Sequence, residues 1–298
     1  MSGTTAATLE RRRVMQPWLI WALTTTVLFG VWGALIEIPE KAGFPATLGY
    51  VVWSLTMIPC AIFAMSHVGW SLDRSRKDIL AGLAAGLLGA GGQVLLFQAL
   101  RSGPAYLVFP IVSLYPVVSV ILSVVILRER TRMRGWIGIL LAFPAIWMLS
   151  YQPATGTASD RWTWLVLTSI VFLCWGVQAF VIKAGTASMT AESMFFYMTL
   201  GGLMVAPAAI AITDFSRPIE WGLRGPWAAA VIQVMNAIGA LTLVYALRSG
   251  PAILVVPMTA LAPVLTVLLS LALYAVVPNG IVVIGLVLAT VAIYLMAE

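Results

Sequence analysis

The side chains in this sequence with the most evident chemistry are amides and aromatic rings set inside long apolar segments. An amide both donates and accepts hydrogen bonds, and a deep indole offers a flat wall with one N–H donor. A ring of such groups can hold a small neutral or zwitterionic molecule without fixing its net charge. The residues expected to form a binding site of this kind are Trp32, Gln93, Tyr115, Trp175, Gln178, Gln233 and Asn236.

The same residues have a structural interpretation that the sequence leaves open. Amides in apolar helices also form hydrogen bonds that hold neighbouring helices together. The two Trp residues precede Gly33 and Gly176, so each could equally pack over a close helix contact. Gln233 and Asn236 are three residues apart and therefore share one helix face.

Titratable groups are scarce in the apolar segments. Glu37 is the acidic residue nearest to a deep position, and a half-buried carboxylate there could couple protons to transport. The alternative is a helix end in contact with water. One His and two isolated cysteines, Cys60 and Cys174, provide neither a metal-ligand pattern nor a disulfide framework. We therefore expect no metal, no cofactor and no enzymatic activity.

The composition identifies the class of protein. Of 298 residues, 61% are hydrophobic and only 9% are charged, whereas roughly 25% are charged in a soluble domain. This excludes a soluble enzyme, a nucleic-acid-binding protein and a disordered chain. The net charge of +6 lies in short loops, where basic residues set membrane orientation rather than attract nucleic acid.

The apolar segments predict an all-α integral membrane protein with ten transmembrane helices and no soluble domain. The expected spans are 17–37, 45–66, 79–100, 104–127, 134–151, 162–183, 192–213, 226–247, 251–275 and 279–296.

Charge distribution predicts the orientation of these spans. The first span follows three arginines but has full length and no small-residue cleavage site, so we expect a retained helix rather than a signal peptide. With the N-terminus inside, inner segments carry 12 basic residues and outer segments carry 5. We therefore expect a multi-pass protein of the inner (plasma) membrane with both termini in the cytoplasm.

An internal repeat is the most informative pattern. Residues 99–105 and 246–252 have the identical sequence Ala-Leu-Arg-Ser-Gly-Pro-Ala, and 16 of the 25 positions from 99 to 123 are identical at an offset of 147. The halves are expected to be residues 1–151 and 152–298. Since each holds five spans, the second half enters the membrane in the opposite sense, as in many secondary transporters.

Prolines recur at matching places in the fourth and ninth spans. Each removes a backbone donor and bends its helix, so we expect two bent helices that flex as gates. A static kink shaped for packing is the alternative. The residues concerned are Pro110, Pro116, Pro257 and Pro263.

Several motifs resemble the EamA-like members of the drug/metabolite transporter superfamily. They are a Trp-Gly in the first helix of each half, Gly-Pro-Ala-x-Leu-Val-x-Pro opening the fourth, and the segment 127–130, Leu-Arg-Glu-Arg. The resemblance implies transport of amino acids or other small metabolites, and some relatives carry nucleotide-sugars or lipid-linked sugars. One departure is that Val276 stands where the second copy usually has an acidic residue, matching Glu129.

These patterns predict a secondary transporter that moves a small neutral or zwitterionic metabolite by alternating access, and the resemblance implies an amino-acid-like substrate and export. The alternative is a flippase or transporter of a lipid-linked or sugar-nucleotide substrate. A membrane enzyme would need paired carboxylates or a His cluster near one surface, and no P-loop is present for direct use of ATP. The expected partners are the substrate and membrane lipid, with the protein a monomer or homodimer.

Overall fold

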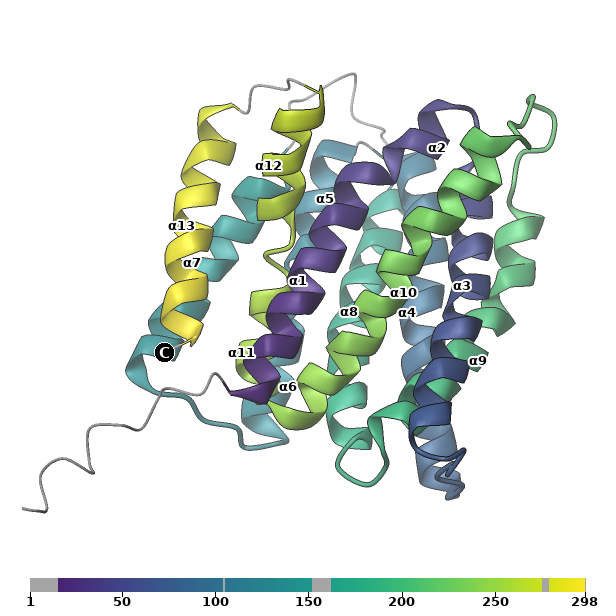
Figure 1. Ribbon diagram of the computed structural model, residues 1–298. Helices are drawn as coiled ribbons and strands as arrows, with labels where there is room; N and C mark the ends of the chain where they lie inside the picture. Colours follow the sequence, from purple (N-terminus) through teal and green to yellow (C-terminus); the bar gives the residue numbers. More distant parts are fainter. Residues whose placement is uncertain (1–15, 104, 152–161, 275–278, 298) are drawn as a thin grey trace, which may run out of the picture.

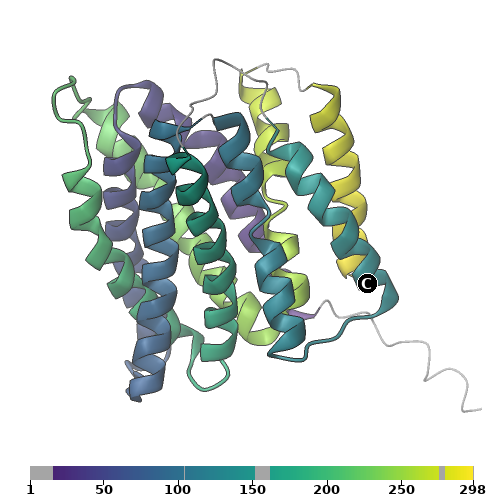
Figure 2. The same ribbon diagram turned by 180° about the vertical axis from the view of Figure 1, so that it is seen from behind.

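The computed structural model describes residues 16–103, 105–151, 162–274 and 279–297, and these described residues form helices and short connections. Figures 1 and 2 show the helices as a single bundle seen from its two sides. We call the end of the bundle that holds Pro17 and Ala297 the lower end. The opposite end, which holds the short helix α2, is the upper end (Figure 1).

The helices follow the predicted spans closely. Their bounds are α1 Pro17–Leu35, α2 Glu37–Lys41, α3 Ala46–His67, α4 Arg76–Ser102, α5 Ala105–Ser113, α6 Pro116–Val125, α7 Met133–Leu149, α8 Thr163–Gly185, α9 Ala191–Ala211, η1 Leu223–Trp227, α10 Ala228–Ser249, α11 Ala252–Thr259, α12 Pro263–Tyr274 and α13 Gly280–Ala297.

The prediction of ten membrane crossings is confirmed. Among the described residues, nine helical segments are long and apolar enough to cross a membrane, and α7 supplies a tenth, shorter apolar helix of 17 residues. α2 continues the first crossing, and η1 leads into the crossing formed by α10. In a membrane this arrangement meets the hydrogen-bonding needs of the backbone, because the N–H and C=O groups of a helix bond to one another.

The fourth and ninth crossings, predicted as bent helices, each consist of two short helices joined at a break. The fourth consists of α5 and α6, and the ninth consists of α11 and α12. Pro116 and Pro263 are the first residues of α6 and α12, a position where the missing N–H costs nothing. Each proline deprives the carbonyl four residues earlier of its helical donor.

The chain repairs both breaks in the same way. The Val112 carbonyl accepts from the Tyr115 N–H at 3.0 Å, one residue before Pro116. The Thr259 carbonyl accepts from the Ala262 N–H at 3.2 Å, one residue before Pro263. Two tight turns with matching hydrogen bonds therefore join the half-helices, and no freed carbonyl at these positions is exposed to hydrocarbon.

The two halves run in opposite senses through the bundle. α1 rises from the lower end to the upper end, whereas α8, the first helix of the second half, descends (Figure 1). Repeat-related contacts follow this inversion. A Cβ added to Gly103 would lie 2.8 Å from Cδ2 of Trp164, and one added to Gly250 would lie 2.9 Å from Cδ2 of Trp18. The structure thus has the predicted fold, two inverted five-helix repeats.

Glycines allow α4 to approach α9 closely. A Cβ added to Gly86 would meet the Met198 carbonyl and lie 2.9 Å from Cα of Gly201. Gly82 faces the Tyr197 side chain in the same interface. Small residues at such contacts let membrane helices pack backbone to backbone.

Replacing Gly86 with Ala should therefore lower thermal stability, because the added methyl group meets α9 backbone that cannot move aside. We expect a cost of about 1–3 kcal/mol, measured as a fall in the unfolding temperature of the purified protein. Gly91→Ala on the same helix is the matched control, since its added Cβ meets nothing within 4 Å. Equal effects of the two changes would contradict the packing argument.

Candidate substrate site

Three of the predicted residues form one hydrogen-bonded cluster between α1, α3 and α10. Trp32 Nε1 donates to Gln233 Oε1 at 3.0 Å, and Asn236 Nδ2 donates to the same oxygen at 3.2 Å. Gln233 Nε2 donates to the Gly49 carbonyl at 3.2 Å. Because Gln233 is only 4% exposed and bonded through both ends of its amide, it joins three helices rather than presenting free donors.

Three others gather between α4, α6 and α8. Trp175 Nε1 donates to the Gly89 carbonyl at 3.1 Å, and the Tyr115 ring meets Trp175 edge-on with centroids 6.0 Å apart. Gln178, one turn from Trp175, packs over Gly89, where an added Cβ would lie 2.8 Å from its Cδ. Gln93 lies one turn beyond Gly89 on α4.

Gln93 and Gln178 differ from Gln233 in that their amide groups are not used in hydrogen bonds to described residues. Both side chains are partly exposed, and neither forms a hydrogen bond to another residue that the structure describes. Asn236 is also partly exposed, and its only described side-chain bond uses its amino group. These amides therefore retain donors and acceptors that no described residue uses.

The predicted residues thus form two clusters, which we name by their indoles: the Trp32 cluster (Trp32, Gln233, Asn236) and the Trp175 cluster (Tyr115, Trp175, Gln178). Within the described part of the chain, no hydrogen bond or ring contact joins them. They belong to different halves of the interface, since α1 packs on α10 and α4 packs on α8.

Hydroxyl groups fix the helices that cross beside each cluster. Ser119 Oγ donates to the Gly176 carbonyl at 2.8 Å, and Thr266 Oγ1 donates to the Gly30 carbonyl at 2.9 Å. Ser119 and Thr266 are repeat partners at the offset of 147. They were not among the predicted residues, and the available signal was a hydroxyl side chain at matching positions of the repeated segments.

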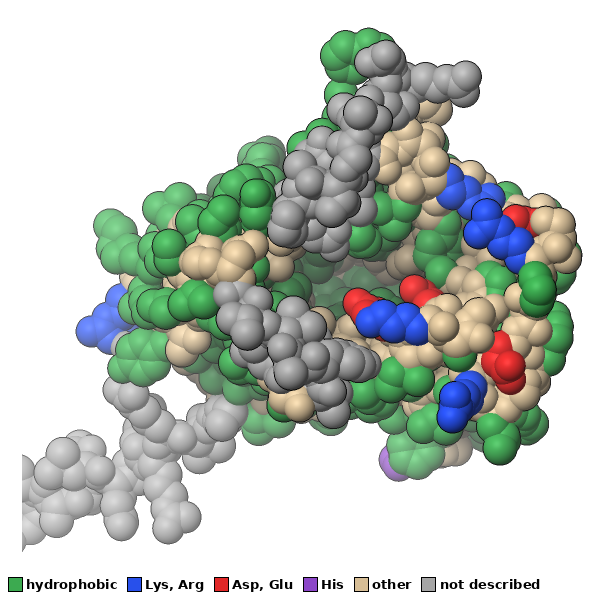
Figure 3. Space-filling model, turned by 90° about the horizontal axis from the view of Figure 1, so that it is seen from above, with side chains coloured by type: hydrophobic (Ala, Val, Ile, Leu, Met, Phe, Trp, Pro, Cys, Tyr) green, Lys and Arg blue, Asp and Glu red, His purple; other side chains and the backbone are tan. Residues whose placement is uncertain are grey.

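The two ends of the bundle differ in how tightly they are filled. All eight residues of α11, at the lower end, are buried. In α5, the repeat-related helix at the upper end, Leu107, Phe109, Ile111 and Ser113 are only partly buried. Seen from above, the upper face is hollowed in the middle, with charged side chains at the rim of the hollow (Figure 3).

Polar contacts between loops help to close the lower end. Asp73 Oδ2 accepts from the Thr190 N–H and Oγ1, both at 2.8 Å, and the Tyr197 hydroxyl donates to the Asp73 carbonyl at 2.7 Å. The Thr190 backbone hydrogen bond lowers the pKa of Asp73 below its usual value. Ser188, in the loop before α9, similarly donates to Asp78 in the first turn of α4 at 2.6 Å.

Glu37 lies where a coupling carboxylate would not be expected. Its side chain is 55% exposed at the start of α2 and pairs with Lys41 one turn later. This is the arrangement of a helix end in water, so Glu37 is left out of the function proposed below.

The prolines predicted as gates occupy two kinds of position. Pro116 and Pro263 lie at the helix breaks, and Pro257 is buried within α11. Pro110 lies within α5, and its side chain is outside the described residues. Whether the breaks move stays a prediction.

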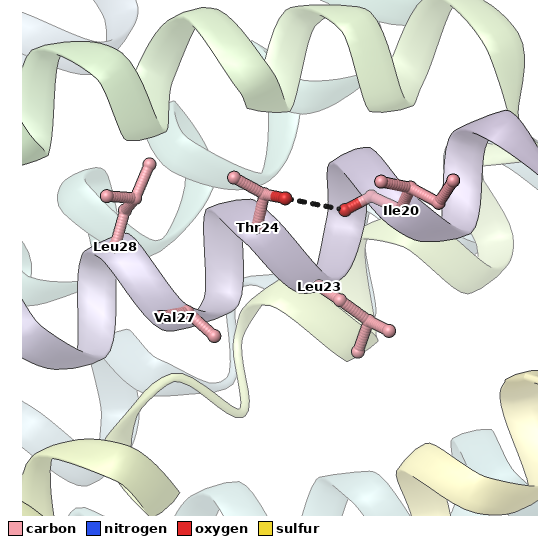
Figure 4. A pocket seen from close by; sticks show the side chains of 5 residues that line it. All are labelled: Ile20, Leu23, Thr24, Val27 and Leu28. Carbon is pink, nitrogen blue, oxygen red and sulfur yellow. Dashed lines mark hydrogen bonds between the residues drawn. The ribbon is translucent and has the colours of Figure 1, made fainter.

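A separate groove of about 520 Å³ runs along α1 (Figure 4). Four of its five lining residues are aliphatic, and the fifth, Thr24, donates its hydroxyl to the Ile20 carbonyl at 2.9 Å. It contains none of the predicted binding residues, and its one hydroxyl bonds within its own helix, so it offers an aliphatic wall and no polar recognition group. Across the described residues, no group of three or more His, Cys, Asp or Glu side chains could hold a metal ion.

The fold and the paired clusters define a multi-pass membrane protein of the inverted-repeat transporter class. Comparison with protein families identifies it further: residues 16–151 and 162–297 each match the EamA-like transporter family. The chain therefore belongs to the EamA-like transporter family, as the motif resemblance predicted, and is a membrane transporter.

Individual relatives are more distant. The chain is 25% identical over 190 residues to protein RarD of Streptomyces exfoliatus, and the match covers 59% of this chain and 57% of RarD. It is 36% identical over 132 residues to the uncharacterized protein MJ1333.1 of Methanocaldococcus jannaschii, covering 44% of this chain and 95% of that protein. The second match is close to the length of one repeat.

A solved crystal structure has the same fold. It superposes with a TM-score of 0.78 at 18% identity, covering 94% of this chain and 96% of the other. At this identity the likeness concerns the fold alone.

The contrast between the two glutamines gives a stability prediction. Gln233→Leu should destabilise the protein by about 1–3 kcal/mol, because it removes the acceptor of the partly buried Trp32 N–H and the amide bond to the Gly49 carbonyl that joins α10 to α3. Gln178→Leu should change stability little, since no hydrogen bond to a described residue is lost. Thermal unfolding of both variants tests this, and a larger loss for Gln178→Leu would reverse the assignment of roles.

Proposed function

We propose that this protein is a secondary transporter that moves a small neutral or zwitterionic, amino-acid-like metabolite by alternating access. Its two five-helix halves, residues 1–151 and 152–298, exchange conformations about a site between them near the bilayer midplane. The protein works without a cofactor, as a monomer or homodimer in lipid.

The observation that carries this proposal is the unequal environment of the repeated segment. α5 and α11 begin with the same motif. All residues of α11 are buried, whereas most of the described side chains of α5 are only partly buried. If the lower end is closed and the upper end is hollowed, the two copies of this motif must pack differently, and they do. Exchange of the two environments would open the lower end and close the upper end.

The chemistry of the clusters supports the substrate class. Their described hydrogen bonds use indole, amide and backbone groups only. Without a buried charge to pair with, a substrate of large net charge would lose its hydration uncompensated. The partly exposed amides of Gln93, Gln178 and Asn236 can instead bond the two ends of a zwitterion.

A lipid-linked or sugar-nucleotide substrate remains the alternative, and the α1 groove is the observation that favours an acyl chain. Its aliphatic wall and volume of about 520 Å³ suit a hydrocarbon tail. Competition assays separate the two: free amino acids would inhibit transport in the first case, and lipid phosphates in the second.

The orientation follows from the charges at each end. Among the described residues, nine Lys and Arg side chains lie toward the lower end and four toward the upper end. We propose that the lower end faces the cytoplasm of an inner (plasma) membrane, so that the hollow of Figure 3 faces outward. Export then begins when the lower end opens.

The orientation predicts which cysteines an impermeant thiol reagent reaches in intact cells. With Cys60 and Cys174 replaced, Arg217→Cys at the upper end should be labelled from outside. Arg76→Cys at the lower end should be labelled only after the membrane is permeabilised. Both native side chains are exposed, which makes the pair a matched control. Labelling in the reverse pattern would invert the proposed direction.

The binding proposal predicts a transport defect without a folding defect. Gln178→Leu and Asn236→Leu should each weaken substrate binding about twofold to tenfold, the effect of one lost hydrogen bond. Uptake into vesicles, with the substrate first found by thermal-shift screening of amino acids, nucleobases, sugars and lipid phosphates, measures this.

Thr290→Val is the matched control for these variants, because Thr290 is an exposed residue of α13 whose hydroxyl bonds only its own helix. It should leave transport unchanged. If Gln178→Leu and Asn236→Leu lose stability but keep native affinity, the two amides are structural and the site lies elsewhere.

A further inference from the structure

The carboxylate of Glu129 lies in a half-buried site at the lower end. Its Oε2 accepts from the Ile253 N–H at 2.9 Å, and its Oε1 is 3.9 Å from Lys183 Nζ. The two side chains are only 12% and 22% exposed. Lys183 in turn donates to the Gly250 carbonyl at 2.7 Å. Three separate segments meet here: the loop after α6, the end of α8 and the junction of α10 with α11.

The junction between α10 and α11 needs these partners. The first N–H groups of a helix and the last carbonyls of another have no intrahelical partner, and Pro251 at the N-cap of α11 has no side chain that can accept a hydrogen bond. Glu129 supplies an acceptor and a negative charge at the N-terminus of α11, and Lys183 supplies a donor at the C-terminus of α10. Both charges have the favourable sign for the helix dipoles.

Glu129 reaches this position through a strained turn. Arg128, the residue before it, has φ of 55°, a left-handed conformation that is uncommon for residues other than glycine. The Glu129 N–H donates to the Ser123 carbonyl at 3.0 Å, which fixes the turn onto α6. Strain of this kind persists only where surrounding contacts maintain it.

The repeat-related residues at the upper end differ in type and exposure. Lys41, the repeat partner of Lys183, pairs with Glu37 one turn earlier, and its side chain is 66% exposed. The repeat partner of Glu129 is Val276. The sequence therefore places the acidic member in only one of the two copies.

We propose that Glu129 and Lys183 form a latch on the α10–α11 junction that holds the lower end closed and makes this the resting state of the transporter. The inference rests on the proposed alternating access and adds which end is closed at rest, and by which contacts. Release of Glu129 from the N-terminus of α11 is the step that frees α11 to move.

A buried reporter in the latch region tests this without any substrate. Ser123 is fully buried on α6, and its hydroxyl has no described partner. In a protein with Cys60 and Cys174 replaced, Ser123→Cys should react slowly with a water-soluble thiol reagent applied from the lower end. Adding Glu129→Ala or Lys183→Met should raise the labelling rate about tenfold or more, the factor of one charge-assisted hydrogen bond. Glu129→Gln should give a smaller rise.

Glu37→Gln and Lys41→Met are the matched controls, because they break the ion pair of the repeat-related lysine at the upper end, the end opposite to Ser123. They should leave the labelling rate of Ser123→Cys unchanged. The exchanged pair Glu129→Lys with Lys183→Glu keeps opposite charges but places each charge at the wrong helix end. Labelling of Ser123→Cys should therefore remain as fast in this variant as in Glu129→Ala. Restored protection in the exchanged pair would overturn the capping role.

Unchanged labelling in Glu129→Ala, with a native unfolding temperature, would overturn the latch. If Glu129→Ala does not fold, the same comparison is made with Glu129→Gln and Lys183→Met. Because the assay uses no substrate, a failure to find any transported molecule would refute the proposed function and leave this result intact.

Discussion

The structure depends on one constraint: backbone groups inside a membrane cannot turn to water for hydrogen bonds. A helix broken by proline in the bilayer is therefore tolerated only where the chain itself satisfies the freed carbonyl. The Tyr115 and Ala262 N–H groups do this with nearly the same geometry in the two halves. Both breaks are thus built into the fold, and each crossing that contains one becomes two short helices.

A short helix can shift independently of the rest of its crossing, but it is less stable by itself than a full-length helix. A helix of eight residues such as α11 is marginal alone, so its position is set by its neighbours. In α11 these are a buried apolar surround, the Glu129 carboxylate and the Lys183 ammonium group. In α5 the surround is thinner. The same motif therefore has two environments, and the contacts that differ between them come from outside the motif.

Hydropathy, repeat spacing and odd span count were sufficient to predict ten crossings in two inverted halves. They could not predict the breaks at Pro116 and Pro263 as distinct from bends, because that depends on local hydrogen bonds. They also could not separate Gln233 from Gln178. Both are amides at central positions, and only the rotation of α10 toward Gly49 shows that Gln233 is fully bonded. Glu37 was selected because it is the acidic residue nearest to an apolar span. Its exposure depends on the exact residue at which the first crossing ends, which the sequence does not specify.

The amides also show why the site is asymmetric although the fold is repeated. At the offset of 147, Gly86 and Gly89 on α4 match Gln233 and Asn236 on α10. Glycines on α4 leave room for Trp175 and Gln178 from α8, whereas the polar groups of the other half belong to α10 itself. In the Trp175 cluster the amide comes from α8, the helix that also carries the indole. In the Trp32 cluster the amides come from α10, the helix that packs against the indole-bearing α1. In the binding mode proposed above, a substrate would lie between two different sets of donors and acceptors, and this difference is the reason for proposing a molecule whose two ends also differ, such as a zwitterion.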